Sequence, residues 1–587
     1  MKKSFLFLAL TSLLALTSCT KNNKNNKVDP KKDEFVNGIK DEQRTFYKGQ
    51  RNKSKITLRF YEETPSIPYI DLTTYFKTFY FLNLNKTKVN ENGKYRYEGK
   101  SNTYLEVDTI NETFTFSDID TICNLSQFNL EACFLKPSVV SLIGTPDIYI
   151  EFSEYHIDLK GDDKEAYMPL TTLDNIFSWV MGYCVSYNGK DVYVLDESWA
   201  VYEYSSLMNY PDYYDVLENK ETFAKDEAEF NYNELCFTID YLQGHPAQMA
   251  IGRSELEAGG LDAALDAYPR LKQALKSTNV KEYVDAQYLF HDILMYDGGH
   301  SGAQYRMYSG TDYMSQILNE DSLLKQKNDY VDQDWEDKYA AYQSVGLTKI
   351  NALGSQLNYY YADKTNKIAY IGFDQFDVDY QGWQMYYLGF SDQIPNENDT
   401  YGFLYTQLQQ AKTDGIEYIV FDITTNGGGD TVALHGTLSF LQSGDTSMIY
   451  KNTISGHIMK EVGKVDRNLD GQFTAADNEF DFDFKYGLLT SKWSFSCGNA
   501  LPTYVRDLNL PILGERSGGG SCCVSYYNDA HGIRSRVSTI WKLLNKDYYE
   551  KDDGVAVDYN LKTVDGSYID FFNTSKVKSK LAEFYSF

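Results

Sequence analysis

Three short segments of this chain hold small residues and glycines where a reacting group could be bound closely. The first is the apolar run of residues 418–423, which leads through Thr-Thr-Asn into the glycines 427–429. Because glycine has no Cβ, the backbone N–H groups of such a run can approach a ligand. The ligand could be a phosphate, a metal-bound anion or the oxyanion of an acyl-transfer intermediate.

The second segment, residues 490–500, is rich in serine and leads into a helix predicted over residues 498–507. Serine at the start of a helix is commonly an N-cap, whose side chain accepts a hydrogen bond from the first turn. It can instead be a nucleophile, because the neighbouring N–H groups can stabilise an oxyanion. Ser496 occupies a position where either role is possible.

The third segment, residues 514–521, reads Gly-Glu-Arg-Ser-Gly-Gly-Gly-Ser after a short predicted strand. It lacks both the glycine spacing and the Gly-Lys-Ser/Thr ending of a phosphate-binding loop, so we do not expect nucleotide binding.

His300 follows Asp-Gly-Gly at the end of a predicted helical region. A lone histidine is often structural, but its pKa near neutrality also suits a general base.

A fourth segment has the spacing of an EF-hand-type calcium loop, with glycine at position 6 and Asp in place of Glu at position 12. Dockerin-like loops also end in Asp. The alternative to a calcium loop is an Asp- and Asn-rich surface turn. The predicted ligands are Asp466, Asn468, Asp470, Gln472, Thr474 and Asp477. We expect a structural Ca²⁺ that braces an insertion, and no catalytic cofactor.

The elements predicted around these segments form an α/β domain over residues 365–580. Strands are predicted over residues 368–373, 416–423 and 511–515, with helices between them that include residues 403–412 and 430–442. Strands that alternate with helices are typical of an α/β domain, whose sites lie at the strand ends.

Two regions precede this domain. Residues 35–225 contain alternating, aromatic-rich segments separated by turn signals, which predict a strand-rich α+β accessory region of one or two subdomains. Residues 228–350 contain apolar residues at three- and four-residue spacings, which predict a helical region that carries His300.

The N-terminus has the pattern of an export signal. Two lysines precede an apolar run over residues 5–16, which is too short for a stable membrane span. Leu-Thr-Ser-Cys then resembles a bacterial lipobox, which predicts a lipoprotein signal peptide over residues 1–18 and lipidation of Cys19. Residues 19–34 are rich in Lys and Asn and predict a disordered tether. We expect a bacterial cell-envelope protein anchored in a membrane, with the outer membrane or cell surface favoured.

Charge and cysteine content narrow the partners. The net charge of −27 argues against nucleic-acid binding, which needs clustered Lys and Arg. Seven cysteines follow Cys19, and an exported protein can form disulfides. Cys123 and Cys133 could pair, although sequence does not set connectivity.

The order and spacing of the glycine run, the serine segment and the glycine loop resemble the C-terminal processing (tail-specific) and tricorn-core family of serine peptidases. That family has an Asp-x-Arg-x-Asn-Gly-Gly-like strand end, a serine at a helix start and then a Gly-Glu-x-Thr-x-Gly-Gly-like loop. The resemblance extends over residues 228–575. It implies a mixed α/β fold of the ClpP/crotonase type and hydrolysis of proteins or peptides.

The resemblance also implies roles for individual residues. Ser496 is the implied nucleophile, and the processing-protease branch would activate it with a Lys that this chain lacks in its glycine loop. The tricorn-like branch takes a histidine from a Leu-x-Asp-x-His-like segment, which implies His300 as general base. The implied oxyanion donors are the N–H groups of Cys497 and of Gly427 or Gly428.

The same branch places an orienting carboxylate in a late Glu-x-x-Gly-Val-x-Pro-Asp-like stretch. Residues 550–558 resemble it, which implies Glu550, with Asp552 as the alternative. Val557 stands in place of the proline, and Thr424 stands in place of the arginine of the first motif. These departures leave a second hypothesis open: a peptide- or lipid-binding lipoprotein of the same fold without turnover.

Overall fold

The computed structural model describes most of the chain after the predicted tether. The described residues are 35–48, 52–79, 85–89, 92–99, 103–117, 133–144, 147–181, 183–196, 220–246, 249–303, 322–323, 333–355, 358–479 and 482–586. The predicted signal peptide, the tether and Cys19 lie outside them. Within the described part, none of the helices combines the length and the apolar character that crossing a bilayer requires.

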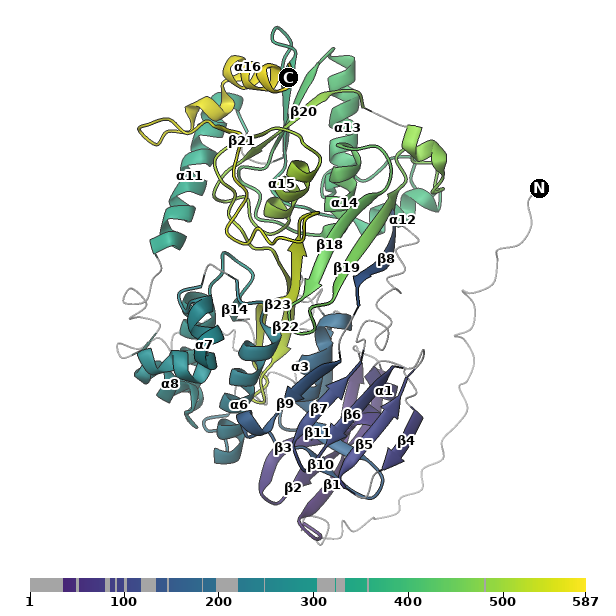
Figure 1. Ribbon diagram of the computed structural model, residues 1–587, viewed down its shortest axis with the longest axis vertical. Coiled ribbons are helices and arrows are strands. Elements are labelled where there is room, and N and C mark those ends of the chain that lie inside the picture. The colour runs from purple at the N-terminus through teal and green to yellow at the C-terminus, as the bar shows by residue number, and fades with distance from the viewer. Residues whose placement is uncertain are drawn as a thin grey trace, which may run out of the picture.

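A six-stranded sheet forms the centre of the C-terminal half (Figure 1). β15 pairs antiparallel with β16, and the remaining neighbours are parallel. In spatial order the strands are β15 (Tyr359–Asp363), β16 (Ile368–Gly372), β17 (Tyr418–Asp422), β20 (Lys485–Thr490), β21 (Ile512–Gly514) and β24 (Tyr559–Asn560). The three strands predicted from sequence in this domain are β16, β17 and β21.

Helices cover both faces of this sheet, because the side chains of its strands alternate between two apolar cores. On β17, Ile419 and Phe421 pack with α13, α14 and α15, whereas Tyr418 and Val420 pack with α11 and α16 (Figure 1). The helices are α11 (Gln333–Leu353), α12 (Tyr380–Tyr387), α13 (Thr400–Thr413), α14 (Thr431–Ser439), α15 (Cys497–Asp507) and α16 (Thr574–Phe584). This arrangement confirms a mixed α/β fold.

A second sheet joins all three regions of the chain. Its spatial order is β14, β23, β18, β19 and β8, and β22 pairs with β23. The strands are β8 (Leu135–Ile143), β14 (Gly302–Ala303), β18 (Thr446–Asn452), β19 (Ile458–Val465), β22 (Cys522–Asn528) and β23 (Arg534–Leu544). β8 comes from the accessory region, and β14 comes from the helical region just after His300. The sheet therefore fixes the position of His300 against the α/β domain.

The N-terminal region contains two antiparallel-rich sheets around one apolar core, which also buries two helices. The first sheet contains β10 (Lys160–Gly161), β11 (Ala166–Pro169), β3 (Thr64–Asp71), β2 (Asn52–Tyr61), β1 (Ile39–Lys48), β13 (Val192–Asp196) and β12 (Tyr183–Tyr187). The second contains β4 (Asn85–Val89), β5 (Lys94–Glu98), β6 (Tyr104–Asp108), β7 (Thr113–Phe116) and β9 (Ile148–Glu151). The helices are α1 (Leu72–Phe79) and α3 (Leu170–Met181).

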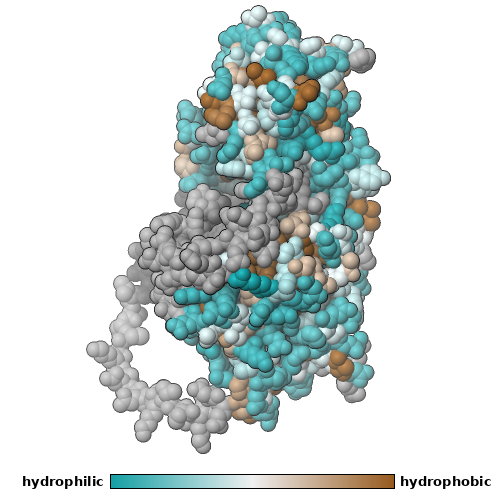
Figure 2. Space-filling model, turned by 90° about the vertical axis from the view of Figure 1, so that its left-hand side faces the viewer, coloured by the Kyte–Doolittle hydropathy of each residue, from teal (hydrophilic) through white to brown (hydrophobic). Residues whose placement is uncertain are grey.

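The helical region that follows the N-terminal region in the chain packs its own apolar core against the β22–β23 hairpin. Its helices are α6 (Lys225–Phe237), α7 (Arg253–Ala264), α8 (Pro269–Leu275) and α9 (Val280–Leu289), and α6 and α9 continue into the π-helical turns Thr238–Leu242 and Phe290–Leu294. On the face that carries α7, α8 and α11, the coloured surface is mostly hydrophilic (Figure 2). That surface agrees with the acidic composition.

Candidate functional site

The glycine turn after β17 lies directly against Ser496. Asn426 is buried and holds the turn: its Nδ2–H donates to the Phe373 carbonyl at 3.0 Å, and its Oδ1 accepts the Gly428 N–H at 2.9 Å. Gly428 has φ of +113°, and a Cβ there would lie 2.5 Å from Ser496 Cβ. Only glycine allows both this conformation and this close approach.

Ser496 itself has a strained backbone, with φ of 55° and ψ of −121°. Positive φ is uncommon outside glycine, and such strain is concentrated at functional sites. Ser496 precedes the first residue of α15, yet its side chain makes no capping hydrogen bond. Its Oγ is therefore not occupied by the cap role that the sequence left open.

The glycine loop runs alongside the Ser496 segment. The Ser496 N–H donates to the Gly519 carbonyl at 3.0 Å, and the Gly518 N–H donates to the Ser494 carbonyl at 2.8 Å. A Cβ on Gly520 would lie 2.3 Å from the Phe495 ring, so the loop packs without side chains there. The three segments singled out in the sequence thus meet at Ser496.

His300 is buried and held by a chain of hydrogen bonds. Its Nδ1 lies 3.2 Å from Ser538 Oγ, and Ser538 Oγ donates to Asp297 Oδ2 at 2.5 Å. Because the serine proton goes to the carboxylate, the serine oxygen accepts the Nδ1–H of His300, and Nε2 keeps its lone pair. Asp297 also accepts the His300 backbone N–H at 2.9 Å. Nε2 has no hydrogen-bond partner among the described residues.

The imidazole lies beside the residue that precedes Ser496. The ring centroids of His300 and Phe495 are 4.6 Å apart. Ser496 Oγ and His300 Nε2 form no hydrogen bond in this structure. Burial lowers the pKa of His300, and the Asp297 charge opposes that shift. The residue is therefore neutral near pH 7, which is the form that accepts a proton.

The carboxylate implied by the family resemblance lies elsewhere. Glu550 forms ion pairs with Arg253 at 2.8 Å and with Lys542 at 3.0 Å, and the imidazole is instead held through Ser538. Asp552 pairs with Arg253 at 2.7 Å, and its charge lies close enough to raise the pKa of His300. Both carboxylate oxygens of Glu550 are thus paired with cations, and Glu550 makes no hydrogen bond to His300 in this structure.

Ser538 gave no signal in the sequence, since it lies on β23 and is 238 positions from His300. Asp297 belongs to the Asp-Gly-Gly-His segment that drew attention to His300, but the resemblance implied a later carboxylate. The short distance in sequence between Asp297 and His300 was the one feature that could have predicted their interaction.

The implied oxyanion donors differ in how they are engaged. Cys497 is the first residue of α15, so its N–H has no acceptor within the helix. The Gly427 N–H donates to the Asp374 carbonyl at 3.3 Å, whereas the Gly428 N–H makes the shorter bond to Asn426. The Cys497 thiol donates to the Gly429 carbonyl at 3.1 Å, and burial raises its pKa. That thiol packs against the turn and is not a competing nucleophile.

A buried lysine lies beneath the glycine turn. Lys349 of α11 is fully buried, with Nζ 3.1 Å from Asp422 Oδ2 and 2.7 Å from Thr425 Oγ1. Tyr359 donates to the same Asp422 oxygen at 2.6 Å. Thr424, which stands where the resembling family has arginine, donates its hydroxyl to the other Asp422 oxygen. Lys349 therefore supplies, from α11, the cation that pairs with the buried Asp422.

Replacing Lys349 with methionine is expected to lower the free energy of unfolding by about 3–5 kcal/mol, because Asp422 would remain buried without its cation. Urea unfolding followed by tryptophan fluorescence measures this change. Lys364→Met is the matched control: that lysine is exposed and pairs with Asp414, so its loss should leave the free energy of unfolding nearly unchanged. Equal losses in the two variants would contradict the role given to Lys349.

The predicted calcium loop forms a compact turn. Asp466 accepts the N–H of Asp470 at 3.1 Å and of Gly471 at 2.7 Å, and Gly471 has φ of +77°. Asp477 accepts the N–H of Arg467 at 3.0 Å and of Thr474 at 2.8 Å. In the part of the chain that the structure describes, no three His, Cys, Asp or Glu side chains are gathered to hold a metal. The backbone shape fits the motif, whereas the carboxylates bind backbone N–H groups.

The cysteines that the structure describes form no disulfide bonds. They are Cys133, Cys184, Cys236, Cys497, Cys522 and Cys523. Cys123 lies outside the described residues.

Comparison with known proteins relates one part of the chain to a known family. The model of peptidase family S41 matches residues 367–561. No curated protein matches the chain. Among solved structures, a photosystem II D1 C-terminal processing protease is 18% identical, over 35% of this chain and 45% of its own, with a TM-score of 0.25.

Two further structures resemble parts of the chain. Mature CPAF complexed with lactacystin is 13% identical, over 37% of this chain and 51% of its own, with a TM-score of 0.26. A lipoprotein from Streptococcus agalactiae is 12% identical, over 61% of this chain and 96% of its own, with a TM-score of 0.33. The match thus spans about half the length of the processing protease and of CPAF. At these identities and scores the resemblances assign no residue.

Proposed function

We propose that this chain, whose residues 367–561 match the model of peptidase family S41, is a serine peptidase that hydrolyses peptide bonds in proteins or peptides. The observation that carries the proposal is the strained Ser496 at the start of α15, with Gly428 packed against its side chain. A strained serine without a capping bond is costly in a purely structural role.

In the proposed reaction, Ser496 Oγ attacks the substrate carbonyl carbon while His300 Nε2 takes its proton. Asp297 and Ser538 hold the imidazole in the tautomer that leaves Nε2 free and stabilise the imidazolium. The Cys497 N–H binds the oxyanion, and a glycine N–H from Gly427 or Gly428 joins it by releasing its bond to the Asp374 carbonyl or to Asn426 Oδ1.

The later steps regenerate the enzyme. His300 returns the proton to the leaving amine, which breaks the C–N bond and leaves an acyl ester on Ser496. Water, deprotonated by His300, then hydrolyses the ester. Catalytic hydrogen bonds commonly tighten only when substrate binds, so the missing Ser496–His300 bond agrees with a substrate-free site.

The proposed activity is tested with the full chain and an unfolded fluorescent protein. We expect new N-termini in the digest and their loss after treatment with a serine-directed phosphonate. Binding of the unfolded protein without any cleavage would contradict a peptidase and would favour a peptide-binding lipoprotein on the same fold.

We also propose that the loop of residues 466–477 binds a structural Ca²⁺. The turn at Gly471 and the oxygen-bearing side chains support it. A free Ca²⁺ concentration about 100 times Kd should stabilise the chain by about 2.7 kcal/mol. Calorimetric titration and thermal unfolding measure this, and the exposed Asp470→Ala should abolish it whereas the exposed control Asp392→Ala should not. Equal melting temperatures with Ca²⁺ and with a chelator would contradict the site.

We also propose a cellular location for the protein. The lipobox-like sequence ending at Cys19 supports a lipid anchor in a bacterial cell envelope. Incorporation of an alkyne fatty acid into the expressed chain tests this, and label that persists in Cys19→Ala would contradict it.

A further inference from the structure

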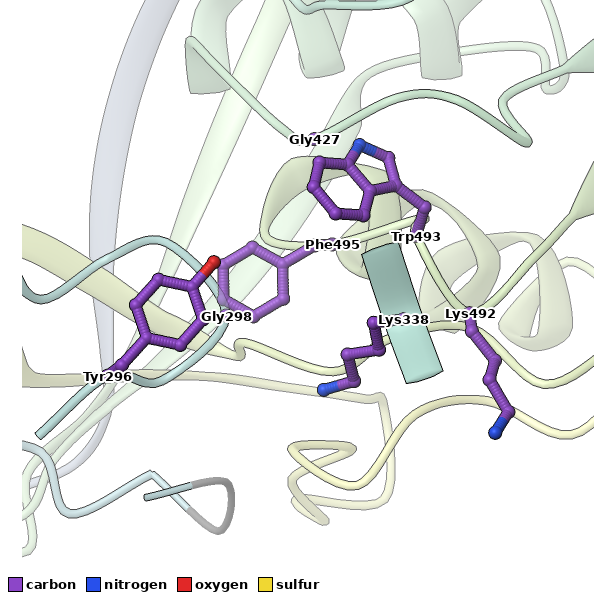
Figure 3. Close-up of a pocket in the computed structure, with 7 residues that line it drawn as sticks. All are labelled: Tyr296, Gly298, Lys338, Gly427, Lys492, Trp493 and Phe495. Atoms are coloured by element: carbon purple, nitrogen blue, oxygen red, sulfur yellow. The ribbon is translucent and has the colours of Figure 1, made fainter. Parts of the chain in front are cut away.

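A small pocket is lined by Phe495, the residue that precedes Ser496 (Figure 3). Its lining residues are Tyr296, Gly298, Lys338, Gly427, Lys492, Trp493 and Phe495. Gly427 and Phe495 directly precede Gly428 and Ser496, which touch each other. A peptide whose carbonyl lies at Ser496 would therefore place a neighbouring side chain at this pocket.

The charge of this pocket opposes that of the chain. The chain has 83 acidic and 56 basic residues, yet both charged residues of the lining are lysines. The nearby Glu515 is already engaged: its carboxylate pairs with Lys562 at 3.2 Å and accepts the Tyr568 hydroxyl at 2.9 Å. The lining of the pocket thus contains two lysines and no carboxylate.

The two lysines come from different elements. Lys338 lies on α11, with Nζ 3.4 Å from the Gly518 carbonyl, and Lys492 lies in the Ser496 segment. Among the described carboxylates, none forms an ion pair with Lys492. In Figure 3 both side chains extend to the same side of Trp493, with their ammonium groups apart. An ammonium has three donors, so each lysine can bind a further acceptor.

The rest of the lining is aromatic and small. Trp493 packs against Tyr342, with ring centroids 4.5 Å apart, and its Nε1 lies 3.8 Å from the position of a Cβ on Gly427. The cavity volume of about 30 Å³ holds roughly two waters, which is the room that a carboxylate needs and too little for a large ring. Aromatic walls also exclude water and strengthen charge interactions.

We propose that this pocket selects substrates with an Asp or Glu side chain next to the scissile bond, through charge-assisted hydrogen bonds from Lys338 and Lys492. The inference rests on the proposed peptidase function and adds a substrate class to it. The chemistry recognised is a carboxylate. Because the aromatic pocket lies beside the nucleophile, the carboxylate that it binds would belong to an internal acidic side chain of the substrate.

The test uses peptides that differ only in the residue before the scissile bond, which is Glu, Gln or Lys, each with a free or an amidated C-terminus. We expect kcat/KM for Glu to exceed that for Gln by about 10–100-fold, because a hydrogen bond to a charged group is lost with Gln. The K338M/K492M double variant should bring this ratio close to one, and K338E/K492E should favour the Lys peptide. Lys580→Met, which removes an exposed lysine paired with Glu583, is the control that keeps the ratio.

Three results would overturn the proposal: equal rates for Glu and Gln, a ratio that persists without both lysines, or a preference that follows the terminal carboxylate. If no peptide is hydrolysed, the proposed peptidase function is wrong. Peptide binding then tests separately whether the pocket selects acidic side chains. Fluorescence anisotropy on Ser496→Ala should still show tighter binding of the Glu peptide, with the difference removed by the two lysine substitutions. Equal affinities would refute the acidic pocket.

Discussion

Replacing Ser496 with alanine is expected to lower kcat for peptide hydrolysis by about 10⁶-fold, because no other group can form the acyl intermediate. The residual rate would come from the oxyanion donors and from substrate binding. Steady-state hydrolysis of a fluorogenic peptide, with a circular dichroism spectrum to show that the variant is folded, measures the loss.

The matched control for this variant is Ser494→Ala. Ser494 is a buried serine of the same segment, and its hydroxyl donates to the Ile423 carbonyl at 2.7 Å. Its loss should cost about 1 kcal/mol of stability and leave a reactive Ser496. A Ser496→Ala protein that retained hydrolysis within tenfold of the original chain would show that another residue is the nucleophile.

Replacing His300 with glutamine is expected to lower kcat by about 10²–10⁴-fold, because the general base is lost. In the original chain, kcat/KM should fall as the pH drops through the pKa of His300, since only neutral imidazole accepts the proton. Burial holds that pKa below its ordinary value of 6.5, so activity should persist into mildly acidic solution. The pH dependence of kcat/KM measures both effects.

Asp297 and Ser538 act through His300 as positioning residues. Asp297→Asn removes the negative charge that raises the pKa of His300, so the acidic limb should move to still lower pH while kcat falls. Glu550→Gln is the contrasting variant: Glu550 is held by Arg253 and Lys542, so the limb should stay in place. A limb that moved with Glu550 but not with Asp297 would restore the carboxylate implied by the family resemblance.

Local sequence patterns predicted the α/β elements around the site. The strand before the glycine run and the helix after Ser496 are present as β17 and α15, because apolar periodicity and glycine placement act over a few residues. The pairing of β8 and β14 with the second sheet was not predictable in this way. Those strands are joined to their partners by contacts between segments far apart in the sequence.

The residues of the site likewise differ in whether the sequence could predict them. Ser496, His300 and the glycine segments could be named from motifs, and the structure brings them together. Ser538 and Lys349 could not be, because each reaches the site from a separate element. Spacing along the chain also cannot predict which of several carboxylates lies near an imidazole, and in the structure Glu550 pairs with Arg253 and Lys542.

The most direct measurement is the chemical identity of the residue modified by a serine-directed phosphonate. The full chain is labelled near neutral pH, digested and mapped by mass spectrometry. A nucleophilic Ser496 activated by His300 predicts a single adduct on Ser496, absent in Ser496→Ala and formed much more slowly in His300→Gln. An adduct on another residue, or unchanged labelling without His300, would contradict it.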